Sequence, residues 1–195
     1  MWHDVLADSR LFSALTRYDE DLAATARAAG CACGGRLDSA RYPRKPRGGP
    51  ADLGAEYGWR LSFCCAADGC RRRMTPPSVR YLGRRVYLGV VVVLVAAMEH
   101  GLSVRRVAAL NQHLGIGLRT LRRWRRWWRG AFVESRLWRG ARGRFMPPVE
   151  EGALPFALLA RFGGDPAART RAVLVLLSPL TTTSAPAHAR VRAGR

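Results

Sequence analysis

Two pairs of cysteines are the residues in this chain whose types and spacing best suit a chemical role. Cys31 and Cys33 lie in the segment GCACGG, and Cys65 and Cys70 lie in FCCAADGC. Glycines in such short turns let backbone amides approach and hydrogen-bond the cysteine sulfurs. Four thiolates facing one another form a tetrahedral site that Zn²⁺ fills without redox chemistry. We therefore predict one structural zinc ion, held by these four cysteines.

The spacing of the cysteines departs from the common C-x-x-C turn. The first pair is C-x-C and the second is C-x4-C, and Cys64 is an alternative third ligand to Cys65. Strand alternation favours Cys65, because it places this residue on the same side as Phe63. A cluster of buried, unreactive thiols is the competing interpretation. Because the chain has no C-x-x-C motif, thiol–disulfide catalysis is not expected.

A second candidate site is the arginine- and tryptophan-rich segment RTLRRWRRWWRG, which begins at Arg119. At about 100° per residue, a helix places three large apolar residues on one face, namely Leu121, Trp124 and Trp128. The opposite face carries five arginines: Arg119, Arg122, Arg123, Arg126 and Arg129. Guanidinium groups form bidentate hydrogen bonds with guanine edges and with phosphates, so the pattern predicts a DNA-reading helix. Further phosphate contacts are expected from Arg105 and Arg106 and from the loop residues Arg44, Lys45 and Arg47.

The overall charge agrees with a polyanionic partner. The 195 residues include 33 Lys and Arg against 14 Asp and Glu, a net charge of +19. The longest apolar run, from Val86 to Met98, is shorter than the roughly 20 residues that span a bilayer. The first 29 residues are acidic and lack the apolar core of a secretory signal. We expect a cytoplasmic, nucleoid-associated protein that makes no membrane contact.

The elements that position these side chains suggest a mainly α fold with a small β zinc ribbon and a helix-turn-helix three-helix core. The segment from Trp59 to Cys65 alternates as a strand would, with Trp59, Leu61 and Phe63 facing inward. Three helices separated by a short turn and by Gly115–Gly117 predict the helix-turn-helix. The expected organisation is an N-terminal helical segment (1–29), a zinc-ribbon-like domain with a basic loop (30–85), the helix-turn-helix domain (86–130), a basic linker with short C-terminal helices (131–180) and a disordered tail (181–195).

The segments CACGGRL, FCC and GCRRRMTPPSVR, followed by LSVRRVAALNQHLGIGLRTLRRWRRWW, resemble a known module. This is the zinc-ribbon plus helix-turn-helix DNA-binding module at the N-terminus of bacterial insertion-sequence transposases. The chain also resembles small bacterial proteins associated with mobile elements, which carry YPRKPRG and TPPSVR segments. The resemblance implies that the four cysteines bind zinc and that residues 119–129 face the DNA. One departure is Gly117, which stands where a serine usually caps the recognition helix.

The resemblance does not extend to catalysis. Transposases need three carboxylates on a mixed sheet to hold two metal ions, and the few acidic residues after Cys70 do not fall in alternating strands. We therefore expect a protein without enzymatic activity. The leading hypothesis is a zinc-containing reader of duplex DNA that acts as an accessory factor of a mobile element or as a transcription regulator. An RNA-binding or ribonucleoprotein zinc ribbon is the alternative. Other candidate partners are a transposase or recombinase and a second copy of the chain.

Overall fold

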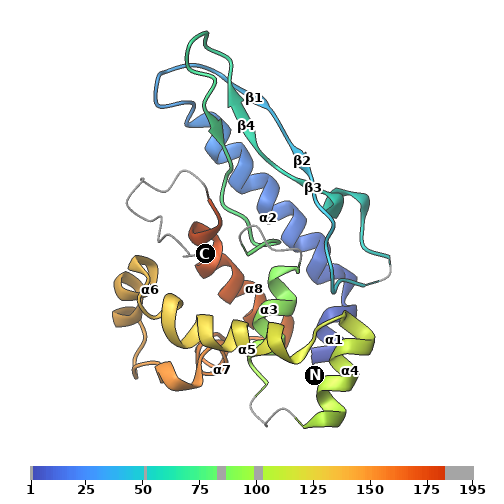
Figure 1. The fold of residues 1–195 in the computed structure, drawn as a ribbon. Helices are drawn as coiled ribbons and strands as arrows, with labels where there is room; N and C mark the ends of the chain where they lie inside the picture. Colours follow the sequence, from blue (N-terminus) through green and yellow to red (C-terminus); the bar gives the residue numbers. More distant parts are fainter. Residues whose placement is uncertain (1, 51, 83–86, 99–102, 183–195) are drawn as a thin grey trace.

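The protein is mainly helical and carries a small antiparallel sheet, as the sequence predicts. The computed structural model describes residues 2–50, 52–82, 87–98 and 103–182 (Figure 1). The helices are α1 (Trp2–Ala7), α2 (Ser9–Ala28), α3 (Gly89–Ala96), α4 (Val104–Leu114), α5 (Leu118–Trp127), α6 (Arg136–Ala141), α7 (Phe156–Leu159) and α8 (Pro166–Leu177). The strands are β1 (Leu37–Ser39), β2 (Tyr42–Pro43), β3 (Trp59–Arg60), β4 (Phe63–Cys65) and β5 (Arg73–Met74).

Helix α2 is the long element that joins the two halves of the molecule. Asp8 caps its first turn by accepting a hydrogen bond of 3.0 Å from the amide of Arg10, and Gly30 follows its end with a φ of 70°. Its 20 residues extend about 30 Å at 1.5 Å per residue. One face is buried along this length, because Leu11, Leu15, Asp19 and Ala23 recur at every fourth position.

An irregular antiparallel hairpin runs beside α2, and we call it the ribbon: residues 37–44 paired with residues 58–65. Leu37 pairs with Cys65 in the β1–β4 ladder, and Tyr42 pairs with Arg60 in the β2–β3 ladder. The two residue numbers of each pair have the same sum, so the register continues across the break between the two ladders. Strand β5 adds to the other edge of β4, giving the order β1-β4-β5.

The prediction that Trp59 faces inward and Arg60 outward is wrong, although Phe63 and Cys65, later in the same segment, are buried as predicted. Trp59 is 38% exposed, whereas Arg60 is 2% exposed. The Arg60 guanidinium donates to the carbonyl of Pro76 at 2.5 Å, and the hydroxyl of Ser62 donates to the carbonyl of Met74 at 3.1 Å. Met74 belongs to β5, and Pro76 lies two residues after this strand. The polar side chains therefore point inward toward acceptors, and the indole of Trp59 points outward.

The largest apolar cluster lies in the helical half. Helix α3 is buried nearly all round, and it packs against α1, α5 and α8. The cluster reaches from Val5 in α1 to Leu177 in α8, so it crosses the boundaries expected from the sequence. Helices occur at the three predicted positions between residues 86 and 130. Helix α4 contributes Leu110 to this core, and Val104 at its start is exposed.

A buried polar junction joins α2 to the segment TPPSVR (residues 75–80) and to the turn after α8, which contains Thr181. The carboxylate of Asp19 accepts hydrogen bonds from the hydroxyl of Ser78 (2.6 Å), the amide of Val79 (2.7 Å) and Nε of Arg80 (2.8 Å). The amide of Ser78 in turn donates to the hydroxyl of Thr181 at 2.7 Å. The TPPSVR segment is thus internal structure.

The C-terminal region differs in part from the expected linker and tail. The segment after α5 continues as a π-helical turn, η2 (Trp128–Phe132), and then as α6, so much of the expected basic linker is helical. Aromatic packing explains this order, because Trp128, Phe132 and Trp138 are all buried and their rings are in contact. The expected disordered tail lies outside the described residues from residue 183 onward. Thr181, by contrast, is buried and hydrogen-bonded.

Candidate metal centre and nucleic-acid interface

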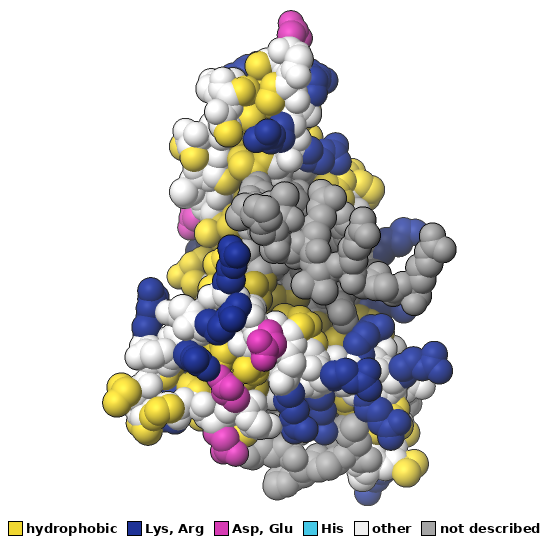
Figure 2. Space-filling view, turned by 60° about the vertical axis from the view of Figure 1, so that its left-hand side comes forward, with side chains coloured by type: hydrophobic (Ala, Val, Ile, Leu, Met, Phe, Trp, Pro, Cys, Tyr) yellow, Lys and Arg dark blue, Asp and Glu magenta, His cyan; other side chains and the backbone are white. Residues whose placement is uncertain are grey.

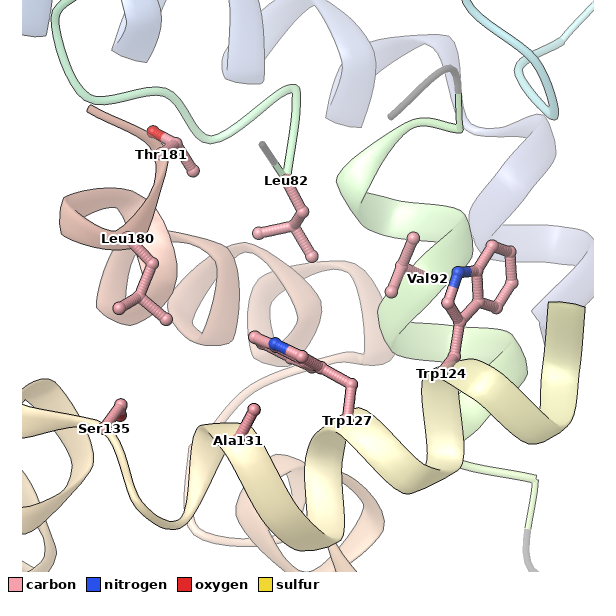
Figure 3. A pocket seen from close by; sticks show the side chains of 8 residues that line it. All are labelled: Leu82, Val92, Trp124, Trp127, Ala131, Ser135, Leu180 and Thr181. Atoms are coloured by element: carbon pink, nitrogen blue, oxygen red, sulfur yellow. The ribbon is translucent and has the colours of Figure 1, made fainter. Parts of the chain in front are cut away.

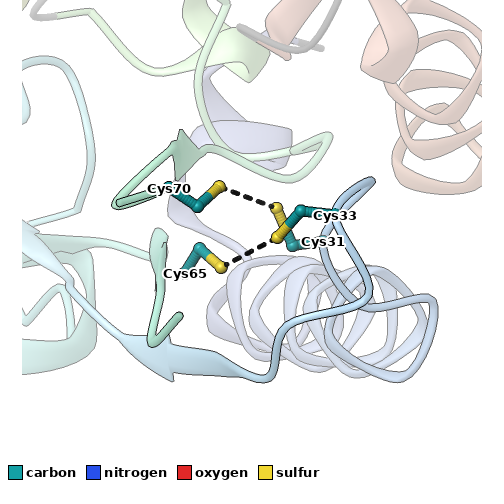
Figure 4. Close-up of side chains that lie close together, drawn as sticks. All are labelled: Cys31, Cys33, Cys65 and Cys70. Atoms are coloured by element: carbon teal, nitrogen blue, oxygen red, sulfur yellow. Dashed lines mark hydrogen bonds between the residues drawn. The ribbon is translucent and has the colours of Figure 1, made fainter. Parts of the chain in front are cut away.

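Four cysteines converge at the end of the molecule where α2 meets the ribbon (Figure 4). Cys31 and Cys33 lie in the loop between α2 and β1, Cys65 ends β4, and Cys70 lies in the turn before β5. The Sγ atoms of Cys31 and Cys70 are 3.7 Å apart, and those of Cys33 and Cys65 are 3.5 Å apart. All four sulfurs lie within 4.8 Å of one another. A zinc ribbon consists of two hairpins that hold one ion, but here only the second cysteine pair lies on a hairpin, and the first pair follows helix α2.

This arrangement could hold one metal ion. Sulfurs that bind a tetrahedral zinc ion at about 2.3 Å lie about 3.8 Å from one another. The two closest sulfur pairs are already at this separation, and a small contraction brings in the others. The apolar cluster around the site is small: its buried members are Ala23, Leu37, Phe63 and Cys65. Because so little apolar surface holds this end together, a bound ion would contribute much of its stability.

Backbone amides favour thiolates at this site. A hydrogen bond from the Gly35 amide, together with the neighbouring thiols, lowers the pKa of Cys33 to about 7. The Ala67 amide acts in the same direction on Cys65, but burial and the other three thiols raise the pKa of Cys65 to about 12. The first thiolate to form therefore makes the next one harder to form. A cation at the centre removes this penalty, so metal binding releases protons.

Two turns of similar shape, after Cys33 and after Cys70, each bring a backbone amide to a cysteine sulfur. Gly34 follows Cys33 with a φ of 80°, and Arg71 follows Cys70 with a φ of 41°. In each turn the amide two residues after the cysteine, in Gly35 or in Arg72, hydrogen-bonds the sulfur. Positive φ is costly for any residue other than glycine, so Arg71 is held there by the surrounding structure.

Gly35 is required for a different reason, which is space. A Cβ atom at this position would lie 2.7 Å from Sγ of Cys65 and 2.9 Å from Cβ of Ala67. Cys64, the alternative ligand considered from the sequence, stands outside the cluster, and its Sγ contacts the carbonyl of Arg71 at 3.5 Å. Strand alternation therefore selected the correct cysteine for the cluster.

The second candidate site is the exposed face of α5. Leu121, Trp124 and Trp128 are at most 1% exposed and anchor the helix in the core. The five arginines predicted opposite them are all exposed: Arg119, Arg122, Arg123, Arg126 and Arg129. Within the described ranges, none of the five forms an ion pair with a carboxylate. Figure 2 shows a group of Lys and Arg side chains gathered over the helical half of one face.

The other predicted phosphate contacts fall on two separate elements. Arg105 is exposed on α4, and Arg106 belongs to the same helix, although its side chain lies outside the described part. Lys45 and Arg47 are exposed beyond β2. Arg44 is half-buried, with its guanidinium 5.3 Å from the ring centroid of Tyr81, and is less available than its neighbours.

No protein-family model, curated protein or solved structure matches this chain. The molecule presents two candidate sites, the cysteine cluster and the exposed arginine face of α5. They lie at opposite ends of the molecule, because α2 separates the cysteine loops from α5 (Figure 1). A metal ion at the cysteines would order the ribbon without touching the arginine face. No helix in the described ranges combines the length and apolar character needed to cross a bilayer.

A cavity of about 270 Å³ lies beside α5 (Figure 3). Trp124, Trp127 and Ala131 line one side of it, and Leu82, Val92 and Leu180 line the others. Trp127 is half-buried there. Arg125, on the same helix, donates to the carbonyl of Met98 at 2.5 Å. The lining of this cavity is mostly apolar and does not suit a phosphate.

Proposed function

We propose that the protein is a zinc-containing reader of duplex DNA and that α5 is its recognition helix. The observation that carries this proposal is a row of five exposed arginines, without ion pairs among the described residues, on a helix whose opposite face is fixed in the core by Leu121, Trp124 and Trp128. Five guanidiniums on one stripe repel one another, and a polyanion relieves that repulsion. The major groove of B-DNA admits an α-helix, and arginine is the residue that most often reads guanine there.

The elements before α5 support a helix-turn-helix. Helix α4 is followed by a turn of three residues, in which Gly115 has a φ of 63°, and then by α5. In this motif the second helix enters the groove and the first crosses the sugar-phosphate backbone. Arg105 on α4 would then hold a phosphate, while Arg122 and Arg126 reach base edges. Gly117 begins α5 without a side-chain cap, which leaves its first amides open to a phosphate oxygen.

Zinc is the metal that the cysteine set favours. Four thiolates within tetrahedral reach are typical of structural zinc sites, in which no coordination position is left open for a substrate. Its proposed role is to hold the α2–β1 loop against the β4–β5 hairpin. The resemblance to the transposase module agrees with this assignment and with a binding protein that has no catalytic activity of its own. An accessory factor of a mobile element and a transcription regulator are the two biological roles that such a reader would serve.

The experiment begins with the zinc-loaded full chain and duplexes selected from a random pool. In Arg122→Ala/Arg126→Ala, affinity for the selected duplex should fall about tenfold or more, because each good bidentate contact is worth about 1–3 kcal/mol. Affinity for an unrelated duplex should fall much less. The matched control is Arg136→Ala/Arg139→Ala, which removes two exposed arginines from α6. Equal losses in the two double variants, or none in the first, would contradict the proposal.

Two further measurements separate the alternatives. In Arg119→Ala/Arg129→Ala, the slope of log affinity against log salt should become shallower by about 0.9 for each phosphate that the variant no longer neutralises. Competition of the labelled duplex by a double-stranded RNA of equal length tests the ribonucleoprotein alternative, since α5 cannot enter the narrow major groove of an RNA helix. The selected sequences then distinguish element ends from promoters.

A further inference from the structure

The outer face of the ribbon, continued by the chain that follows residue 44, carries a strip of cations beside an exposed aromatic ring. From residue 41 to residue 47 exposed and half-buried side chains alternate, and the exposed ones are Arg41, Pro43, Lys45 and Arg47. In an extended chain alternate side chains share one face and stand about 7 Å apart. The three cations in this set form no ion pair within the described ranges. We call these four residues together with Trp59 the outer strip.

Trp59 belongs to this face by register. It lies directly opposite Pro43 in the β2–β3 ladder, and directly opposed residues of an antiparallel pair project to the same side. Its indole is 38% exposed, and the guanidinium of Arg41 lies 4.7 Å from the ring centroid. The inner face of the ribbon is occupied otherwise, since Arg60 is buried against the carbonyl of Pro76. The ring is therefore held outward by the fold.

The chemistry of this strip suits an unpaired nucleic-acid strand. Bases stack on exposed aromatic rings, and a track of cations follows the phosphates of the same strand. In a duplex each base is already covered on both faces, so a surface indole can stack only on a base that is unpaired. We propose that the outer strip binds single-stranded nucleic acid, with one base extending the stack that Arg41 begins on Trp59. Lys45 and Arg47 would pair with its phosphates.

Trp59 lies away from the exposed arginines of the proposed duplex-reading helix. The Arg47 end of the strip approaches only the buried side of that helix, because Arg47 pairs with Tyr87 and the ring of Tyr87 packs on Trp124. The ribbon lies along α2 in the upper half of Figure 1, whereas α5 lies in the lower half. Variants of the two surfaces should therefore affect binding to a single strand and binding to a duplex independently. A single strand stacked on Trp59 should leave the exposed arginines of α5 free, and replacement of those arginines should leave the ribbon intact.

The test measures fluorescence anisotropy of a labelled oligo(dT) of about 12 nucleotides, within the site sizes typical of single-strand binders. The zinc-loaded full chain is used at one fixed salt concentration. In Trp59→Ala the dissociation constant should rise roughly 5- to 150-fold, the range produced by removing one base–aromatic stack. Trp59→Phe should recover most of the affinity. In Lys45→Ala/Arg47→Ala, measured over a series of salt concentrations, the salt slope should become shallower by about 0.7 for each phosphate no longer neutralised.

The controls separate this site from the rest of the protein. Tyr18→Ala removes another exposed aromatic ring, on α2, and should leave binding to the single strand unchanged. Arg122→Ala/Arg126→Ala should weaken binding to the duplex and spare the single strand. The inference is overturned if Trp59→Ala binds the oligonucleotide as the wild type does, if it weakens duplex binding equally, or if it changes only the oligomeric state. An oligo(rU) of the same length shows whether the strip prefers RNA or DNA.

Discussion

Gly35 shows how a single residue shapes the candidate metal site. Its amide hydrogen-bonds the sulfur of Cys33, while the space beside its Cα is filled by the sulfur of Cys65. One residue thus connects the two halves of the cysteine cluster, and it can do so only because it lacks a side chain. Gly34, its neighbour, has open space but a positive φ, so the two glycines are needed for different reasons.

Gly35→Ala should lower zinc affinity at least tenfold, because the new methyl group pushes Cys65 out of tetrahedral reach. Overpacking of this kind also costs about 1–3 kcal/mol of stability. Competition with a chromogenic chelator measures the affinity, and elemental analysis gives zinc per chain. Gly58→Ala is the matched control, since nothing lies within 4 Å of a Cβ at that position. Unchanged zinc affinity in Gly35→Ala would show that the cluster does not bind metal in this geometry.

At the scale of elements, helix α2 is held by charge as well as by apolar packing. Asp19 is fully buried and meets Arg80, which is 2% exposed, and the guanidinium of Arg80 also lies 5.0 Å from the ring centroid of Tyr57. The donors to this carboxylate, Ser78, Val79 and Arg80, all come from the TPPSVR segment. The junction therefore fixes the position along α2 at which this segment packs. A buried pair of this kind is strongly destabilised when one partner loses its charge.

Asp19→Asn should therefore lower the free energy of unfolding by about 3–5 kcal/mol, because it leaves the buried charge of Arg80 uncompensated. Urea denaturation followed by circular dichroism measures this loss. Asp21→Asn, on the exposed side of the same helix, should change stability by less than about 0.5 kcal/mol. If the two variants unfold at the same urea concentration, the ion pair does not hold α2 to the segment.

On the scale of the whole molecule, the described residues form two apolar clusters of very different size. The large one occupies the helical half, and the small one surrounds the cysteines at the far end of α2. The ribbon half has little apolar surface with which to offset the entropy of ordering its turns. We therefore expect the two halves to depend on the metal to different degrees.

Removal of zinc by a strong chelator should increase amide hydrogen exchange in residues 31–42 and 61–74 and leave α3, α5 and α8 protected. The reason is that metal binding and folding are coupled only where the ion crosslinks the chain. Hydrogen exchange measured by mass spectrometry resolves the two regions. Cys65→Ser should reproduce the effect without chelator, whereas Cys64→Ser should bind zinc normally. Uniform exchange across both halves would mean that the ion stabilises the whole chain.

Local patterns in the sequence were enough to predict several features. The four clustered cysteines follow from residue type and from the alternation of a short strand. The two faces of α5 follow from helical periodicity, and the burial of α3 follows from its uniformly apolar side chains. In each case neighbouring residues along the chain carry the information, because periodicity decides which side chains share a face.

Features that depend on distant partners were decided only by the tertiary structure. Alternation predicted Trp59 inward and Arg60 outward, but Arg60 is buried with its guanidinium on the carbonyl of Pro76, and Trp59 is exposed. Asp19 finds Arg80 across a long stretch of chain, and no local pattern marks that pair. The separation of the cysteines from α5 likewise depends on how α2 lies between them (Figure 1). A polar group is buried only where a hydrogen-bonding partner lies beside it, and the fold decides which residue that partner is.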